Sequence, residues 1–166
     1  MKILFRLVLL AGGVAAGVWL WLVLFPGPEK VIRQRLAEMA HSASFNANEN
    51  PLVALGDAQK LAGFCSPALH VKLAAPVNIE HAFDSRQEIV QFVLAARAAF
   101  GGALKVEFVD VLVTLASDKL SAAADLTARM QSSSPSDLNL QEIKFTLKKI
   151  DGQWIIMNAE TVRTFS

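Results

Sequence analysis

Two polar side chains near the C-terminus interrupt a face that is otherwise apolar. If Asp151-Gly152 forms a two-residue hairpin turn, Lys149 opposes Trp154, and the pairing continues back to Ile143 opposite Glu160. One face of the hairpin then carries Ile143, Phe145, Leu147, Trp154, Ile156, Asn158 and Glu160. An inward carboxylate is costly without a partner, and in a pocket it could act as a base or orient a ligand. The alternative is that Asn158 and Glu160 lie where the strand runs past the core into solvent.

Two further titratable residues could serve the same pocket. His81 shares a face with Ile79 and Phe83, where a histidine could move protons near neutral pH; a hydrogen-bonded core histidine is the alternative. Asp110 falls at a predicted β-bulge, which can turn a side chain toward a site, although surface exposure fits equally well. The candidate ligand pocket therefore comprises His81, Asp110, Trp154, Asn158 and Glu160. The three histidines of the chain lack metal-ligand spacing, so we predict no metal and no cofactor.

Three helices are predicted to position these residues. An apolar stripe at steps of three and four residues predicts the first helix over about 29–44. Asn50 as a capping residue and Pro51 just inside the start predict the second. Ser85 and Glu88 form a capping box that opens the third helix, and Gly101-Gly102 closes it.

The rest of the chain alternates in the manner of β-strands. Short strands are predicted over 68–73 and 79–83, and long antiparallel strands over 104–115, 120–130, 138–150 and 153–164. The apolar face changes near Val109-Asp110, which predicts the β-bulge. This number of strands and helices predicts an α+β domain whose helices pack on one face of the sheet.

Residues 1–28 differ from the rest of the chain. Residues 7–25 carry no charge, and a helix of this length spans roughly 28 Å, the thickness of a bilayer core. Lys2 and Arg6 precede the apolar run, and Trp19 and Trp21 lie near its far end. We therefore predict an uncleaved transmembrane signal-anchor over 1–28, followed by a domain over 29–166; a cleaved signal peptide is the alternative.

The anchor predicts a single-pass protein whose N-terminus is cytoplasmic and whose domain lies outside the cytoplasm, since translocating the basic N-terminal tail is the costlier choice. Gly13 and Gly17 form a G-x-x-x-G pair that could bring two such helices together as a homodimer. The alternative is that these small residues only reflect the usual composition of membrane helices.

The charge of residues 29–166 excludes several classes of protein. Lys2 and Arg6 belong to the anchor, and the remaining basic and acidic residues nearly balance. A near-neutral domain with this apolar content is neither a basic nucleic-acid binder nor a disordered tail. Its length suits a single domain.

The order of these elements, ending in the hairpin Lys148-Lys149-Ile150-Asp151-Gly152-Gln153-Trp154-Ile155-Ile156, resembles the nuclear-transport-factor-2-like superfamily, which includes SnoaL-like polyketide cyclases and ketosteroid isomerases and has a cystatin-like fold. The resemblance implies a cone, in which a curved antiparallel sheet wraps three helices and leaves a pocket at the open end. Isomerases of this superfamily use a tyrosine to hold an oxyanion. This chain has ten phenylalanines and no tyrosine, so that form of the chemistry is not expected.

These observations lead to two hypotheses about function. The first is a membrane-anchored, non-enzymatic domain of the cell envelope that binds a protein partner or a small apolar ligand. The second is a polyketide-cyclase-like or isomerase-like enzyme, in which Glu160 or Asp110 acts with His81 on an apolar substrate. Convergence of these side chains on one cavity would favour the enzyme.

Overall fold

The computed structural model describes residues 27–73, 79–132 and 138–162. The chain divides into two units, Met1–Val31 and Ile32–Ser166. No helix among the described residues is long and apolar enough to cross a membrane. The predicted membrane span, residues 7–25, and the predicted pairing residues Gly13 and Gly17 lie outside the described part of the chain.

The three predicted helices are present as α2 (Pro28–Ala43), α3 (Pro51–Phe64) and α4 (Arg86–Phe100). The predicted caps are also confirmed. The Asn50 side chain accepts a hydrogen bond from the Leu52 N–H at 2.9 Å, and the Ser85 hydroxyl accepts one from the Glu88 N–H at 3.2 Å. Gly101 ends α4 with a φ of 68°, a conformation that costs glycine little.

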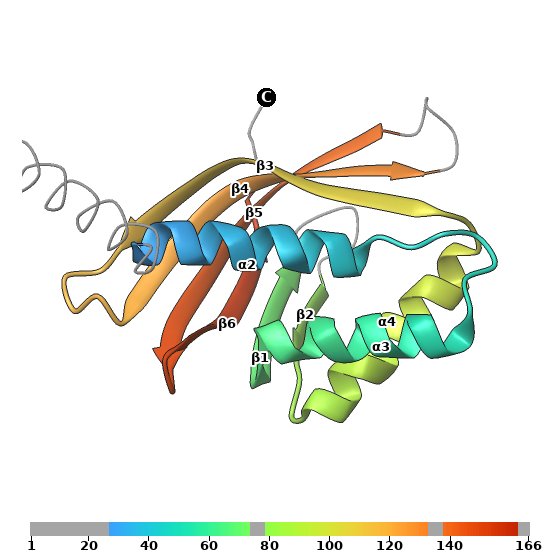
Figure 1. Cartoon of the computed structure of the whole chain (residues 1–166), viewed down its shortest axis with the longest axis horizontal. Coiled ribbons are helices and arrows are strands. Elements are labelled where there is room, and N and C mark those ends of the chain that lie inside the picture. Colours follow the sequence, from blue (N-terminus) through green and yellow to red (C-terminus); the bar gives the residue numbers. More distant parts are fainter. Residues whose placement is uncertain (1–26, 74–78, 133–137, 163–166) are drawn as a thin grey trace, which may run out of the picture. The chain divides into compact units, whose positions relative to one another are not determined.

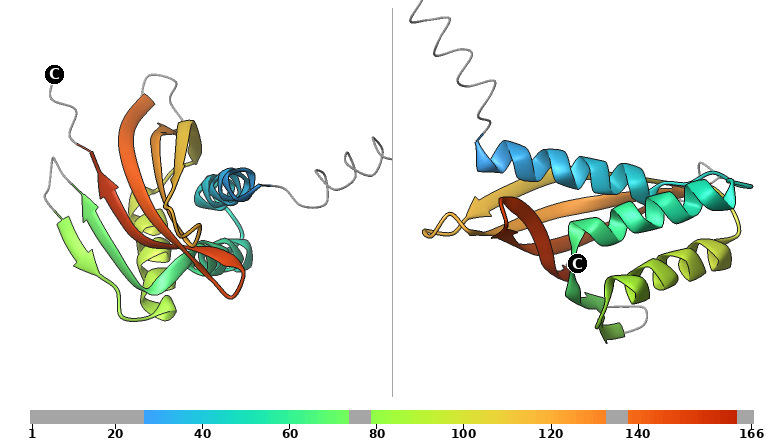
Figure 2. Two further views of the ribbon diagram at one scale, coloured as in Figure 1. Left: turned by 90° about the vertical axis from the view of Figure 1, so that its left-hand side faces the viewer. Right: turned by 60° about the horizontal axis from the view of Figure 1, so that its bottom comes forward.

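One six-stranded sheet carries the helices, with the strand order β2-β1-β6-β5-β4-β3 (Figure 1). The strands are β1 (Cys65–Leu73), β2 (Ile79–Ala82), β3 (Leu104–Leu115), β4 (Ser121–Ser132), β5 (Leu138–Ile150) and β6 (Gln153–Thr161). Figure 2 shows the helices on one side of the curved sheet. The α+β class and the packing of three helices on one face are as predicted.

The prediction of a wholly antiparallel sheet is wrong, because β1 pairs with β6 in parallel. The sequence alternation of a half-buried strand is the same for either direction of pairing. Direction is fixed only where a tight turn joins neighbouring strands, as between β5 and β6. The chain between β1 and β6 contains α4 and four other strands, so no turn sets the direction of this pair.

The predicted bulge in β3 is confirmed. The β3–β4 register shifts between Val109 and Leu112, and Asp110 has a φ of 53°. Before the bulge, the even-numbered residue Phe108 pairs with buried Ala128. The extra residue changes the alternation, so that after the bulge the odd-numbered Val113 is buried and pairs with Ala124. Asp110 itself is exposed.

A second bulge, in β6, overturns the predicted register of the last hairpin. Asp151 and Gly152 form the turn with φ values of 49° and 80°, and the pairs as far as Leu147 with Ile156 are those predicted. Thr146 then pairs with Asn158, so Met157 is the extra residue, and Glu160 opposes Lys144 instead of Ile143. A shift of one residue moves the following side chains to the other face.

The core lies between the helices and the face of the sheet that Trp154 shares with Ile156. Trp154, Ile32, Leu36 and Leu147 are the largest side chains that are fully buried. Phe145 and Ala124 extend this layer across the next strands, with exposed fractions of 4% and 0%. The inner face at this level is filled by the protein's own side chains.

Candidate functional site

The structure does not gather the five residues of the predicted ligand pocket. Trp154 is 2% exposed within the core, and Asp110 is exposed at the bulge of β3. Asn158 and Glu160 lie on the outer face because of the bulge at Met157, so the prediction that they share the face of Trp154 is wrong. His81 pairs with Val71 and alone remains on the inner face with Trp154.

Glu160 occupies a row of alternating charges on the outer face. Its directly opposed neighbours are Lys72 of β1 and Lys144 of β5. The row continues to Glu80 beyond Lys72 and to Asp125 beyond Lys144. Opposed cross-strand residues of opposite charge attract, so this placement gives Glu160 a role in sheet pairing.

His81 lies in a small aromatic cluster at the start of α4. Its Nε2 is 3.2 Å from the Glu88 Oε1, and its ring centroid is 4.5 Å from that of Phe83 and 6.4 Å from that of Phe92. Glu88 also accepts a hydrogen bond from the Asp84 N–H at 2.9 Å. The hydrogen bond from the Asp84 N–H is the main cause that holds the pKa of Glu88 below its ordinary value of 4.5, and the contact with His81 lowers this pKa further.

This lowered pKa predicts how Glu88→Gln depends on pH. A group whose pKa is lower in the folded state stabilises the fold above its unfolded pKa and loses that contribution as the pH falls through the folded value. We expect the melting temperature of Glu88→Gln to be below that of the wild type at neutral pH. The difference should shrink below the ordinary value of 4.5. Thermal melts followed by circular dichroism across the acidic range test this, and a constant difference would contradict it.

Two hollows lie elsewhere, between α2 and the edge strand β3. One of about 480 Å³ is lined by Ala37, Ala40 and His41 of α2, by Ser44 just after the helix, and by the five consecutive residues 105–109. A second of about 500 Å³ shares His41, Ser44 and Lys105 with the first and also reaches Glu49, Asp57 and Gln131. We name the two together the edge cleft.

Helical spacing explains the wall that α2 contributes to the edge cleft. Residues 37, 40 and 41 follow one another at steps of three and one, which places them on one stripe of α2, and Ser44 lies one residue past the end of the helix. Ala37 and Ala40 are small, so this stripe leaves room beside the strand. A helix stripe set against an edge strand therefore forms a cleft with one wall of side chains and one of backbone.

The end of the edge cleft is fixed by bonds from the loop after α2. Phe45 forms an isolated antiparallel bridge with Leu104, with N–H···O distances of 2.8 and 2.9 Å. The Ser44 Oγ accepts a hydrogen bond from the Val106 N–H at 2.9 Å. Because strand groups alternate, the N–H and C=O of Phe108 point to this same edge and could bond a polar atom of a ligand. Further along, the Arg33 Nη1 donates to the carbonyl oxygen of Val111.

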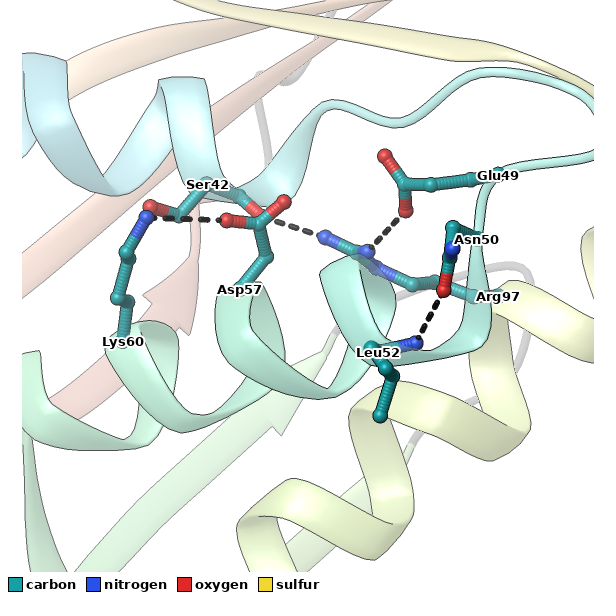
Figure 3. A network of polar contacts seen from close by, with 7 residues as sticks. All are labelled: Ser42, Glu49, Asn50, Leu52, Asp57, Lys60 and Arg97. Carbon is teal, nitrogen blue, oxygen red and sulfur yellow. Dashed lines mark hydrogen bonds and ion pairs between the residues drawn. The ribbon is translucent and has the colours of Figure 1, made fainter.

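A largely buried arginine holds the loop that closes the cleft (Figure 3). The Arg97 Nη1 is 2.9 Å from the Glu49 Oε2, and its Nη2 donates to the Ser42 carbonyl oxygen at 2.6 Å. Its guanidinium also lies 5.1 Å from the centroid of the Phe45 ring. The Arg97 and Glu49 side chains are 9% and 16% exposed. The arginine thus satisfies a carbonyl at the end of α2 and links α4 to the cleft wall.

The polar end of the cleft carries groups of both charges. The Asp57 carboxylate is 19% exposed and lies 3.4 Å from the ammonium of Lys60, which is 69% exposed. Lys105 pairs with Glu107 at 2.7 Å on the exposed side of β3. Within residues 27–73, 79–132 and 138–162, no three His, Cys, Asp or Glu residues lie close enough to hold a metal ion. The arrangement can bind an apolar body and orient one polar group.

Sequence reasoning missed this cleft because its walls are far apart in the chain. His41 is exposed on α2, and it lies near Lys105 because of the bridge between Phe45 and Leu104. Phe45 is a single residue of extended chain, which is too short to give a periodic hydrophobic pattern in the sequence. The polar segment Asn46-Ala47-Asn48-Glu49 after α2 is a local sign that the chain turns there.

Comparison with solved structures identifies the fold. Neither a family model nor a curated protein matches the sequence. A nuclear-transport-factor-2-like protein of unknown function from Pseudomonas putida is 14% identical, with a TM-score of 0.63 over 83% of this chain and 87% of that one. Aln2 from a Streptomyces species is 17% identical, with a TM-score of 0.62 over 84% and 94%. A putative scytalone dehydratase from Novosphingobium aromaticivorans is 14% identical, with a TM-score of 0.56 over 82% and 83%.

These neighbours include proteins of unknown function as well as a putative enzyme, so they bear on the fold and not on the activity. A solved structure from Nostoc punctiforme, described as cystatin-like, is 13% identical and has a TM-score of 0.58. This chain and the cystatin-like cone share three helices packed on a curved, mixed sheet. The chain therefore has the nuclear-transport-factor-2-like, or cystatin-like, fold.

Proposed function

We propose that this chain is a membrane-anchored, non-enzymatic binding domain that holds a small apolar ligand in the edge cleft. The observation that carries the proposal is the pair of adjoining hollows, of about 500 and 480 Å³, beside the edge strand. Each is within the range of roughly 300–1,000 Å³ that is usual for small-molecule sites. The apolar run at residues 7–25 and the basic residues before it support the anchor, with the N-terminus in the cytoplasm.

The lining of the cleft defines the class of ligand. Ala37, Ala40, Val106 and Phe108 offer apolar surface to the body of the ligand. His41, Glu49, Asp57, Lys105 and Gln131 offer polar groups at one end. Few polar groups in an otherwise apolar site fix the orientation of a ligand. We therefore expect a compact aromatic or alicyclic molecule with a single polar group.

Methyl NMR of the full chain in detergent tests this proposal, with 2-naphthol as the probe. We expect the alanine and valine methyl signals of Ala37, Ala40, Val106 and Val109 to shift in one saturable titration, because these residues line the cleft. Ala37→Trp should fill the hollow and weaken probe binding by about tenfold or more, equal to 1.4 kcal/mol.

Thr114→Trp is the matched control, because Thr114 is exposed on the outer face of the same strand. This variant should bind 2-naphthol as the wild type does. Shifts that concentrate at residues outside the cleft, or equal binding by Ala37→Trp and the wild type, would contradict the proposal.

His81 supports a second candidate function, an enzyme with a histidine–carboxylate pair. An imidazole held 3.2 Å from a carboxylate, with Phe83 and Phe92 beside it, is oriented for proton transfer on an apolar substrate. In this case the full chain should turn over a member of a ketosteroid and lactone panel. His81→Ala should then lower the rate by about a hundredfold. No turnover of the panel would leave the binding function as the better account.

A further inference from the structure

Helix α4 exposes an apolar surface along its C-terminal half. From Gln91 to Phe100 the exposed positions are Gln91, Phe92, Ala95, Ala96, Ala98, Ala99 and Phe100. Phe92 and Phe100 are 54% and 46% exposed. Arg97 is the one charged residue of this stretch, and its side chain turns inward to Glu49 and Ser42. A stretch of ten helical residues without an exposed charge is unusual on a surface helix, since exposed faces normally carry charged or polar residues.

The exposed side of α2 provides a comparison within the same domain. Arg33, Gln34, Glu38 and His41 are all exposed there, as expected of a helix that faces water. Figure 2 shows α4 beyond α3, on the side away from α2. Helix α4 therefore lies at the margin of the helical layer. At its end, Phe100 packs edge to face against Phe45 of the edge cleft, with 5.8 Å between the ring centroids.

We propose that this side of α4 binds α4 of a second copy of the chain, in antiparallel orientation about a twofold axis that passes near Ala96. Phe92, Ala96 and Phe100 are spaced by four residues and lie on one stripe, with Ala95 and Ala99 beside them. A twofold axis at Ala96 places Phe92 of each copy against Phe100 of the other. The contact is isologous, because each residue meets its counterpart reciprocally.

The residue types of the stripe favour a second copy over other occupants. The alanines allow two helices to approach to about 8 Å, and the phenylalanines fill the space at both ends. When two copies pair through the same surface, equal charges meet and repel each other. This stripe carries no charge, so no such repulsion arises. A helix that lies on a bilayer normally carries several basic residues along its polar flank, whereas Arg86 at the start of α4 is the one exposed basic residue of this helix.

Cysteine cross-linking of the full chain tests this pairing. Ala96→Cys places a thiol at the twofold axis, so mild oxidation in detergent should yield a covalent dimer as the main product. The native Cys65 is 4% exposed, and burial raises the pKa of its thiol to about 11, so it does not compete. Leu112→Cys is the matched control, because Leu112 is 61% exposed on the outer face of β3. We expect at least about tenfold less dimer from this control, equal to 1.4 kcal/mol of preference.

A charge on the stripe should abolish the cross-link. We expect Phe92→Glu and, separately, Ala99→Glu to lose the Ala96→Cys dimer, because two equal charges then meet in the interface. Ala99→Glu guards against a folding defect, since Phe92 also contacts Phe83 at 5.5 Å between ring centroids. Equal cross-linking of Ala96→Cys and Leu112→Cys would overturn the proposal, as would an undiminished dimer in a folded Ala99→Glu variant.

A lipid-quenching measurement separates a second copy from a bilayer. With a bimane label on Ala96→Cys in phosphatidylcholine vesicles, we expect spin-labelled lipid to quench the fluorescence no more than for a label on Leu112→Cys. Stronger quenching at residue 96 would place α4 in the bilayer and overturn the proposal.

Discussion

Replacing Trp154 with alanine is expected to lower the free energy of unfolding by about 3–5 kcal/mol. Trp154 is 2% exposed and lies in the layer formed by Phe145, Leu147 and Ile156, so the substitution removes apolar contacts and leaves a cavity. Urea unfolding of the full chain, followed by far-ultraviolet circular dichroism, measures the loss. The prediction is large because the indole is the largest side chain in the core.

Leu112→Ala is the matched control for this experiment. Leu112 is 61% exposed on the outer face, so we expect its free energy of unfolding to change by no more than about 0.5 kcal/mol. A loss of similar size in the two variants would show that Trp154 does not hold the core. It would then be a candidate for a wall of an open pocket, as the sequence-based hypothesis required.

Replacing Arg97 with methionine is expected to lower the free energy of unfolding by about 2–4 kcal/mol, slightly below the loss for a completely buried pair. The substitution leaves the Glu49 carboxylate without its cation and the Ser42 carbonyl without its donor. Both side chains of the pair are largely buried, at 9% and 16% exposed, so water screens little of the lost attraction. The same urea unfolding measures the effect.

Two further variants isolate the cause. Adding Glu49→Gln to Arg97→Met should recover part of the loss, because a neutral amide replaces the uncompensated charge. Lys105→Met is the control, since Lys105 and Glu107 are 67% and 41% exposed and such pairs contribute at most about 1 kcal/mol. Equal losses in Arg97→Met and Lys105→Met would contradict a structural role for the buried pair.

Local sequence signals predicted the elements of the fold. Asn50, Ser85 and Gly101 set the ends of helices through contacts within a few residues, and all three act as predicted. Asp151-Gly152 set the turn between β5 and β6. The change of apolar face near Asp110 predicted the bulge in β3, because leucine and valine residues lie on both sides of it to mark the change.

The residues of the site were harder to predict. In β6 the apolar residues 154–157 occupy both faces, so they conceal the bulge at Met157 that turns Glu160 outward. The edge cleft depends on Phe45 meeting Leu104, a contact between distant segments that no local pattern encodes. The resemblance to a cone implied a pocket at its open end, whereas the edge cleft lies between α2 and β3.

The most direct test of this account is to identify the small molecule that the full chain retains when it is purified from membranes. We predict that mass spectrometry of extracts will find one compound bound to the wild type and to Thr114→Trp but absent from Ala37→Trp, because only the last variant fills the edge cleft. A compound retained equally by Ala37→Trp and the wild type would show that the ligand binds elsewhere and would contradict the assignment of the edge cleft as the binding site.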